Sequence, residues 1–569
     1  MRRTLVTLLV AAMPLAAAAQ RDTTLDRQLL PLDVRHEVAD RWNGANALRA
    51  SDRLEIADGH EVLGNVSVQH GPLIIAGHVT GTVLAINSDV VLRPTAKIDG
   101  DLLVVGGEVD GRDAAHVSGS IRIYRQSLQY REEGDGIVIS DDASPGEDNW
   151  WRRLEHRHDE NFNEVLRIVQ AGPYNRVEGL PVQLGPVVSR RTPWGSVRMD
   201  ANVIVRTGTS FASDRADFGH NLRTEVRIGR QRAIGVGAQV MNVVDPIESW
   251  QLSDLEVALA AFLARHDYRD YYQRHGGAGF ITLYGARDIS LTGSYGEERW
   301  SSRALRNPFT LFNDNGPWRD NPLVDEGLFH VENLELKFDT RTDPDDPWAG
   351  WFLNADMEHG RGTIAQAAPT STVPSSDRAG LTDYTRGFFD FRRYNRLGPE
   401  AQLNMRVVLG GWLSGDPLPL ERRLSVDGPG ALPGFGFRST GTGTDVATCN
   451  RGVGVAGRPA ECDRIALAQI EYRGDLRIDF LGDWNGWPHR YHSGRGDVQW
   501  VFFADAGRGW NVGQPDGTFT YERGAFPSLS TFRSDFGLGL DFAGFGVYAA
   551  KALSSPEPVM FFVRLRHRF

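Results

Sequence analysis

The sequence predicts an all-β protein in which a short N-terminal β-solenoid is followed by a transmembrane antiparallel β-barrel. Three observations predict this fold class. A glycine recurs every 17 to 19 residues between Gly64 and Gly119, and each one opens an alternating run of aliphatic residues. The final residues, PVMFFVRLRHRF, alternate apolar residues with arginines. After the first twenty residues, no run reaches the roughly 18 apolar residues that a membrane-spanning helix needs.

The first residues, MRRTLVTLLVAAMPLAAAAQ, have the pattern of a secretory signal peptide. Arg2 and Arg3 precede a short apolar run that ends in small residues. We expect residues 1–19 to be removed on export, with cleavage before Gln20. A single membrane anchor is the alternative, but the apolar run is short for a spanning helix.

The repeat that predicts the solenoid is visible when four segments are written in register. They are GNVSV from Gly64, GTVLAI from Gly81, GDLLVV from Gly100 and GSIRIY from Gly119. A period of this length corresponds to one coil of a β-solenoid, with glycine at the corners. We predict a solenoid over residues 50–125.

These repeats resemble the bactofilin-like, polymer-forming β-helix family. The resemblance implies that the solenoid could associate end to end with other copies. A capped spacer between partners is the alternative. The polar segment that follows, residues 126–175, is predicted to be a linker, and the barrel is expected to occupy residues 176–569.

The last strand of the barrel is expected to have two unlike faces. Phe561, Val563, Leu565, His567 and Phe569 share one face, whereas Phe562, Arg564, Arg566 and Arg568 share the other. A strand between lipid and a polar barrel interior explains both faces; a soluble β-sandwich is the alternative. The terminal Phe569 resembles the recognition signal of bacterial outer-membrane proteins, which implies that the barrel-assembly machinery inserts this chain.

Alternating segments predict sixteen strands, with fourteen as the alternative number. We expect eight strands to begin near residues 348, 382, 400, 464, 497, 531, 545 and 557, and seven of the earlier strands to begin near 178, 196, 220, 232, 276, 288 and 330. Short turns would then lie on the periplasmic side, with long loops at 358–381 and 414–463 outside. One helix is expected to begin with a capping box of Ser253 and Glu256, to end before Gly276, and to place RHDYRDYY on the barrel rim.

Two cysteines, Cys449 and Cys462, lie close together in the second long loop. An exported chain meets an oxidising compartment, so we expect a disulfide that stabilises the fold by about 3 kcal/mol. Two free thiols are the alternative. A zinc site needs more ligands than this pair offers, and we predict no cofactor and no metal.

Several segments of the second half resemble the BamA/TamA-like bacterial surface antigen family. They are PLPLERRLSVDGPGALPGFGF, the strand motif FADAG at 503–507, KFDTRTDPDDPWAGW and IEYRGDL at 470–476. The resemblance implies that the first of these is an extracellular loop that folds into the barrel and acts as a plug, over 423–438. It implies that the loop tip, Leu432, Pro433, Gly434 and Phe435, lies near the strand motif, with Phe503, Asp505 and Gly507 facing inward.

In this family an arginine at the loop tip pairs with the aspartate of the strand motif. Here Pro433 stands in the place of that arginine. We therefore expect Arg438 to reach Asp505 or Glu471 instead. The periplasmic POTRA modules of family members that insert or secrete proteins are also missing from the sequence, and the solenoid stands in their place.

Two functions remain open. The resemblance implies a barrel of the bacterial outer membrane, with its solenoid in the periplasm, that assists the assembly, insertion or translocation of envelope components. Its partners would be outer-membrane lipid and envelope protein clients. The missing arginine and POTRA modules favour instead a channel or structural barrel whose solenoid self-associates or contacts envelope polymer. The net charge of −11 argues against nucleic acid. No Gly-x-Ser-x-Gly elbow is present, and we predict that the protein is not an enzyme.

Overall fold

A computed structural model describes most of residues 24–569. Outside the described part lie residues 1–23, 28–29, 45–46, 52, 70, 129, 134–135, 140–163, 209–216, 230–231, 286–288, 313–315, 342–346, 348, 371–374, 399–400, 439–448, 450–457, 477–497, 513–525, 543–544 and 554. The predicted signal peptide falls outside the description. The chain divides into two compact units, Met1–Ile139 and Ser140–Phe569, which are described separately.

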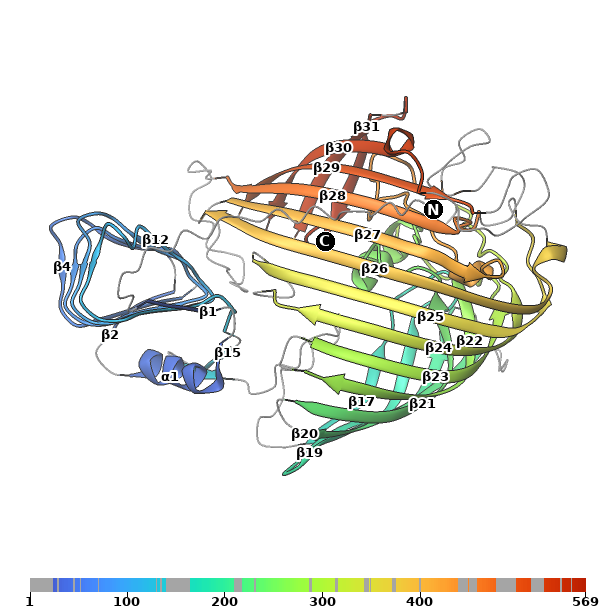
Figure 1. Cartoon of the computed structure of the whole chain (residues 1–569), viewed down its shortest axis with the longest axis horizontal. Helices are drawn as coiled ribbons and strands as arrows, with labels where there is room; N and C mark the ends of the chain where they lie inside the picture. Colours follow the sequence, from blue (N-terminus) through green and yellow to red (C-terminus); the bar gives the residue numbers. More distant parts are fainter. Residues whose placement is uncertain are drawn as a thin grey trace, which may run out of the picture. The chain divides into compact units, whose positions relative to one another are not determined.

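The first unit is a β-solenoid of about four coils built from three parallel sheets (Figure 1). The six-stranded sheet has the order β1 (Thr24–Arg27), β14 (Ile121–Tyr124), β11 (Leu102–Val105), β8 (Val83–Ile86), β5 (Asn65–Gln69) and β2 (Ala47–Ala50). The second has β13 (His116–Val117), β10 (Lys97–Ile98), β7 (His78–Val79) and β4 (Glu61–Val62), and the third has β12 (Val109–Asp110), β9 (Val90–Leu92), β6 (Leu73–Ile75) and β3 (Leu54–Ile56). The predicted solenoid is confirmed.

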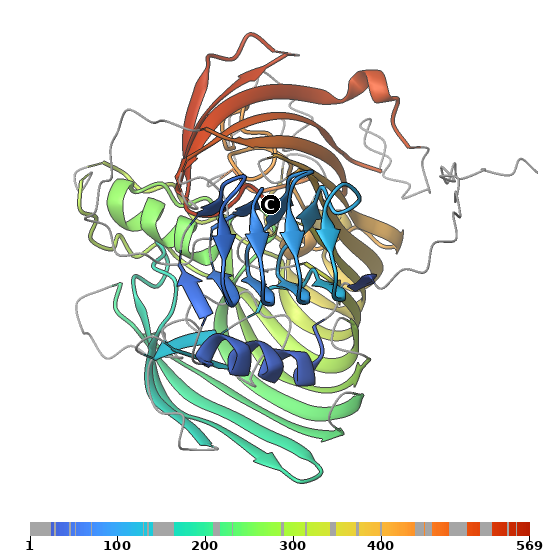
Figure 2. The same cartoon turned by 90° about the vertical axis from the view of Figure 1, so that its left-hand side faces the viewer.

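Aliphatic side chains of equivalent repeat positions stack inside the coils. Val66, Val83, Leu102 and Ile121 lie in register on neighbouring strands and are all buried. The helix α1 (Leu32–Asn43) runs across the coils on the outer face of the six-stranded sheet (Figure 2). Both faces of that sheet are therefore packed.

The corner glycines of the repeat are required because the coils approach each other closely. A Cβ on Gly100 would lie 2.6 Å from the carbonyl oxygen of Gly81, and one on Gly119 would lie 2.6 Å from the carbonyl oxygen of Gly100. Backbone atoms of the neighbouring coil cannot move aside as a side chain could. The period seen in the sequence thus reflects contacts between successive coils.

We expect Gly100→Ala to lower the free energy of unfolding of the solenoid by about 2 kcal/mol, because the new methyl group overpacks the corner. Gly59→Ala is the matched control. Gly59 has open space around its Cβ position and only a φ of +76° to disfavour alanine, which costs about 1 kcal/mol. Limited proteolysis of the full-length protein measures the difference, and equal protease resistance of the two variants would contradict the stacking argument.

The second unit is a sixteen-stranded antiparallel sheet in which each strand pairs with the next one in sequence. Its strands are β17 (Glu164–Ala171), β18 (Pro181–Thr192), β19 (Gly195–Arg206), β20 (Phe218–Gly229), β21 (Ala233–Pro246), β22 (Tyr271–Tyr284), β23 (Ile289–Ser302), β24 (Glu326–Asp339), β25 (Gly350–Gln366), β26 (Gly380–Gly398), β27 (Ala401–Gly415), β28 (Arg464–Asp475), β29 (Gln499–Trp510), β30 (Arg533–Phe542), β31 (Phe545–Ala552) and β32 (Met560–Arg564). The predicted all-β class and strand number are confirmed. Among the described helices, none is long and apolar enough to cross a membrane.

The segment predicted to be a linker, 126–175, contains structure at both ends. The hairpin of β15 (Tyr130–Glu133) and β16 (Gly136–Ile139) belongs to the first unit, where Ile137 packs with α1. The first barrel strand, β17, begins at Glu164. The described strands therefore extend into both ends of the predicted linker.

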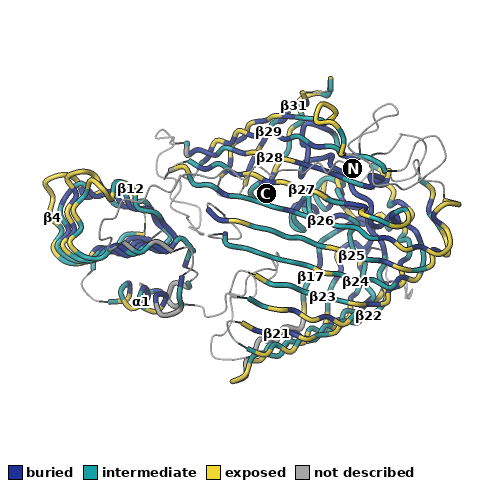
Figure 3. Tube along the Cα trace, viewed as in Figure 1, coloured by how far each residue is buried: buried dark blue, intermediate teal, exposed yellow. Residues whose placement is uncertain are grey.

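The barrel strands have an apolar outer face and a polar inner face. Along β30, Leu538 is 61% exposed, whereas Asp535 and Asp541 on the opposite face are buried. The same alternation of buried and exposed residues recurs along other strands (Figure 3). This pattern is the reverse of that in a soluble protein, and it is typical of a barrel with a polar interior.

Candidate functional site inside the barrel

The loop between β27 and β28 contains a long buried segment. Residues 418–428 are all buried, including the charged residues Glu421, Arg422 and Arg423. A loop on the outside of a protein would expose such residues to water. Arg422 lies 2.6 Å from Glu358 on β25 and donates to the Tyr272 hydroxyl on β22 at 2.8 Å, so this segment packs against the inner faces of the strands.

The tip of this loop binds the last strands. The backbone N–H of Gly434 donates to Asp535 Oδ2 on β30 at 2.6 Å. A Cβ on Gly434 would lie 2.7 Å from Asp535 Cβ and 2.8 Å from the amide nitrogen of Ala552, so glycine is needed here. The carbonyl of Ala431 accepts from the Gln469 side chain. Leu432 and Phe435 pack with Leu467, and Pro433 is also buried.

The prediction that Arg438 pairs with Asp505 or Glu471 is wrong. Arg438 has a left-handed φ of 49°, and its amide donates back to Asp427. Its guanidinium lies 2.8 Å from Glu248 and 3.4 Å from Asp270. The turn thus directs Arg438 toward the loop that follows β21.

Asp270 is the centre of a buried charge cluster. Arg176, Arg319 and Arg438 come from three separate loops, and each has a guanidinium nitrogen within 3.4 Å of this carboxylate. Burial alone would raise the pKa of Asp270, but the nearby arginines outweigh it and lower the pKa below its ordinary value. Burial and the neighbouring Arg176 lower the pKa of Arg319 to about 10. Sequence reasoning missed this cluster, although RHDYRDYY contains Asp270.

The loop after β21 also enters the interior. The helix α3 (Asp254–Ala264) begins with the predicted capping box of Ser253 and Glu256. Glu256 is buried and also accepts from Arg564 Nε at 2.6 Å and from the Leu565 amide at 3.1 Å. The helix ends at Ala264, with Arg265 in the left-handed conformation as its C-cap, and the expected stop residue Gly276 is part of β22. The segment RHDYRDYY follows the helix end, and Asp267, Arg269, Asp270 and both terminal tyrosines are buried.

The cation beside Asp505 comes from the end of the chain. Arg568 pairs with Asp505 Oδ2, and its guanidinium carbon lies 3.6 Å from the ring centre of Phe503. A second carboxylate, Glu471, is 3.9 Å from Arg568 and pairs with Arg473. Phe503, Asp505 and Glu471 are all buried beside Arg568, and Gly507 is on the same buried face of β29.

The last five residues leave the sheet. β32 ends at Arg564, and Phe569 is buried with its ring 6.5 Å from that of Tyr394 on β26. The expected outward position of Phe569 is wrong. Arg564 and Arg568 are buried as the alternation predicts. Bonds to Glu256, Asp505 and Glu471 explain why this segment turns inward.

Cys449 and Cys462 are joined by a disulfide in the structure, with a Cα–Cα distance of 4.9 Å. Cys462 is buried beside Leu424 and Val426 of the inward-folded loop. The backbones of Leu424 and Cys462 exchange two hydrogen bonds of 3.1 Å. The crosslink thus lies where the loop returns toward β28.

Removing this crosslink with Cys449→Ser should lower the free energy of unfolding by about 3 kcal/mol, since the short loop is then unrestrained in the unfolded chain. Urea unfolding of the full-length protein in lipid vesicles measures the loss. Reduced wild type should match the variant. A variant as stable as oxidised wild type would contradict this prediction.

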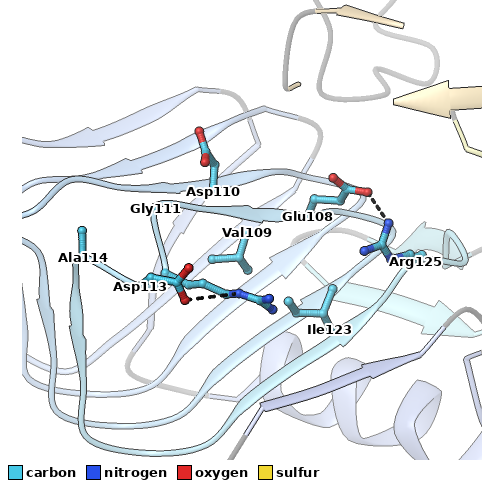
Figure 4. A pocket seen from close by; sticks show the side chains of 9 residues that line it. Glu108, Val109, Asp110, Gly111, Asp113, Ala114, Ile123 and Arg125 are labelled. Atoms are coloured by element: carbon cyan, nitrogen blue, oxygen red, sulfur yellow. Dashed lines mark hydrogen bonds and ion pairs between the residues drawn. The ribbon is translucent and has the colours of Figure 1, made fainter. Parts of the chain in front are cut away.

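A cavity of about 390 Å³ lies at the last coil of the solenoid (Figure 4). Glu108 and Arg125 on its wall form an ion pair of 2.6 Å, and Arg112 lies 3.8 Å from Asp113. These two pairs lie at a partly exposed surface, and the wall residue Asp110 is exposed. Among the described residues, no group of histidine, cysteine, aspartate and glutamate has an arrangement that could hold a metal ion.

Comparisons with known proteins give distant structural likenesses. No family model and no curated protein matches the chain. A structure of BamA from Haemophilus ducreyi lacking POTRA domains 1–3 is similar over 70% of this chain and 69% of that chain, at 12% identity and a TM-score of 0.42. CdiB from Acinetobacter baumannii and CdiB from Escherichia coli each match 70% of this chain at 11% identity, with TM-scores of 0.31 and 0.29. The matches cover 58% and 61% of those two chains, so this chain spans less than two thirds of either CdiB.

Proposed function

We propose that this protein is a β-barrel of the bacterial outer membrane that assists the assembly, insertion or translocation of envelope components, with its solenoid in the periplasm. The observation that carries the proposal is a barrel whose buried loop segments bind its inner face, while among the described residues the two end strands of its sheet do not pair with each other. An interior filled by the protein's own segments is unsuited to an open channel. Two end strands without hydrogen bonds to each other have free edges that suit the binding of other polypeptide chains.

The outer face supports the membrane location. Val236 on β21, Ile281 on β22 and Leu538 on β30 are 51%, 54% and 61% exposed. Apolar side chains at alternate positions across so many strands would be costly in water, and lipid is the solvent that suits them. We infer that outer-membrane lipid covers this face and that the barrel-assembly machinery inserts the chain.

Three inward-folded segments support a plugged interior. They are the loop 418–438, the segment 247–270 with α3, and residues 565–569. Hydrogen bonds link them to the strands and to one another, for example from the Gln251 side chain to the Ser425 carbonyl and from Arg406 on β27 to the Trp250 carbonyl. In this proposal the loop 423–438 is the plug.

The ends of the sheet support an action on other polypeptides. Among the described residues, β17 pairs only with β18, and β32 pairs only with β31 over five positions. A strand edge of this kind offers backbone N–H and C=O groups to an incoming strand. Envelope proteins rich in β-strands are therefore the expected clients.

Deletion of the gene followed by quantification of the outer-membrane proteome tests the proposal. Loss of other barrels, restored by the wild-type gene, is the expected result. A photo-crosslinker at Val169 of β17 or Phe561 of β32 should capture envelope proteins, whereas the matched outward position Ile281, in the middle of the sheet, should not. An unchanged proteome together with equal crosslinking at all three positions would refute the proposal.

A structural barrel without insertase activity is the second candidate, favoured by the solenoid and by the absence of a tip arginine. This candidate has two forms, an open channel and a purely structural barrel. Single-channel recording in planar bilayers distinguishes them. A steady conductance in wild type would support a channel, whereas a closed barrel together with an unchanged proteome would support a structural role.

A further inference from the structure

Two aspartates face each other inside the barrel. Asp505 of β29 and Asp535 of β30 are register partners in the antiparallel ladder, and both are buried. Side chains of directly opposed residues on one face of such a pair have Cβ atoms about 5 Å apart. Two carboxyl groups are therefore neighbours in a place that bulk water does not reach.

Each aspartate binds a different inward-folded segment through one oxygen. Asp505 Oδ2 pairs with Arg568 of the C-terminal segment, and Asp535 Oδ2 accepts from the Gly434 amide at the loop tip. The second oxygen of each group, Oδ1, is buried and has no hydrogen-bond partner among the described residues. Leaving two buried carboxylate oxygens unsatisfied is costly.

The surrounding charges leave too few cations for this pair. From β28, Arg473 pairs with Glu471 and with Asp541 of β30. From the C-terminal segment, His567 lies 3.4 Å from Asp541, and Arg568 lies between Asp505 and Glu471. Two further charged or titratable groups among the described residues are Arg533, which stacks on Phe435 at the loop tip, and Tyr548 of β31, which donates to Asp541.

Among the residues that the structure describes, Arg568 is thus the one cation bonded to the pair, and it is shared between Asp505 and Glu471. Two like charges at this spacing in a buried site cannot both persist without a large electrostatic cost. A proton between the groups removes one charge and gives both unsatisfied oxygens a partner. The chemistry of the site therefore calls for one bound proton.

We propose that Asp505 and Asp535 form a binding site for a single shared proton, and that this proton joins the loop tip to the C-terminal segment. With the proton bound, Gly434, Asp535, Asp505 and Arg568 form one connected chain. When the proton leaves, the two carboxylates repel each other, and the segments attached to them are driven apart. The site is independent of whether the barrel handles client proteins.

The proposal fixes the sign of a pH effect. The folded protein holds a proton that the unfolded chain releases above about pH 4, the ordinary range of aspartate. Unfolding then releases a proton, so stability falls as the pH rises above that value. Relative to a variant without the shared proton, the unfolding equilibrium constant of wild type should rise by up to about tenfold per pH unit.

Asp535→Asn is the test variant, because asparagine is neutral and keeps a group that can bond to Asp505. Asp541→Asn is the matched control, on the same strand and the same face but paired with Arg473. Urea unfolding in lipid vesicles, followed between about pH 5 and pH 8, should show the predicted slope in wild type and in Asp541→Asn. Asp535→Asn should lack it.

Infrared spectroscopy of the folded full-length protein gives a direct reading of the proton. The carbonyl-stretch band of protonated carboxyl groups should lose the intensity of one group in Asp535→Asn and should keep it in Asp541→Asn. If Asp535→Asn does not fold, Asp505→Asn serves in its place. Parallel pH profiles for wild type and the test variant, with equal carboxyl bands, would overturn the proposal.

Discussion

Replacing Arg568 with alanine is expected to lower the free energy of unfolding of the barrel by about 3–5 kcal/mol. The change leaves Asp505 buried without its cation, and loss of one partner of a buried ion pair costs about this much. It also removes the guanidinium stacked on Phe503 and one of the bonds that hold the C-terminal segment inside. Urea unfolding in lipid vesicles measures the loss.

Two further variants show whether the buried charge is the cause. Arg361→Ala removes an ion pair with Glu332 whose side chains are 55% and 47% exposed, and it should cost less than about 1 kcal/mol. The double variant Arg568→Ala, Asp505→Asn should recover part of the loss, since it no longer buries the Asp505 charge. If the double variant is less stable than Arg568→Ala, the loss of stability comes mainly from the lost packing and not from the buried charge.

Asp270→Asn is expected to have an effect of similar size, about 3–5 kcal/mol. Arg176, Arg319 and Arg438 then face one another without their shared carboxylate, and these residues connect three loops. The control is Glu332→Gln, which removes an exposed partner of Arg361. Equal stability of these two variants at neutral pH would contradict a central role for Asp270.

The effect of Asp270 should also depend on pH in a defined direction. Its pKa is lowered in the folded protein because the arginines outweigh the effect of burial. A carboxyl group of this kind stabilises the fold above its unfolded pKa of about 4, and the contribution is lost as the pH falls through the folded value. The difference between wild type and Asp270→Asn should therefore be full at neutral pH and should shrink in acid.

Local patterns predicted much of this fold. A strand between lipid and a polar interior must alternate, so segments such as SDFGLGLDF predicted β30 and its inward Asp535 and Asp541. The solenoid repeat is visible because each coil places a glycine at the same tight corner. The capping box of Ser253 and Glu256 involves four consecutive residues, and it was predictable for that reason.

The contacts inside the barrel were not predictable, because they join distant parts of the chain. Arg438 bonds Glu248 at a separation of 190 residues, and Arg564 bonds Glu256 at a separation of 308. No period or motif encodes such a pairing. The strand β17 was missed because it follows a highly polar stretch, and the inward turn after Arg564 was missed because the alternation continues in the sequence after the strand has ended.

The stacked glycine corners have a consequence for how this protein can diverge. Each coil touches only the coils beside it, and equivalent residues meet at every step. Duplication or deletion of one complete repeat would therefore preserve the type of contact between successive coils while changing the solenoid's length by about 4.8 Å, the spacing of neighbouring strands. Relatives could evolve arms of different reach in increments of one repeat, whereas a change of a few residues within a coil would break the stack.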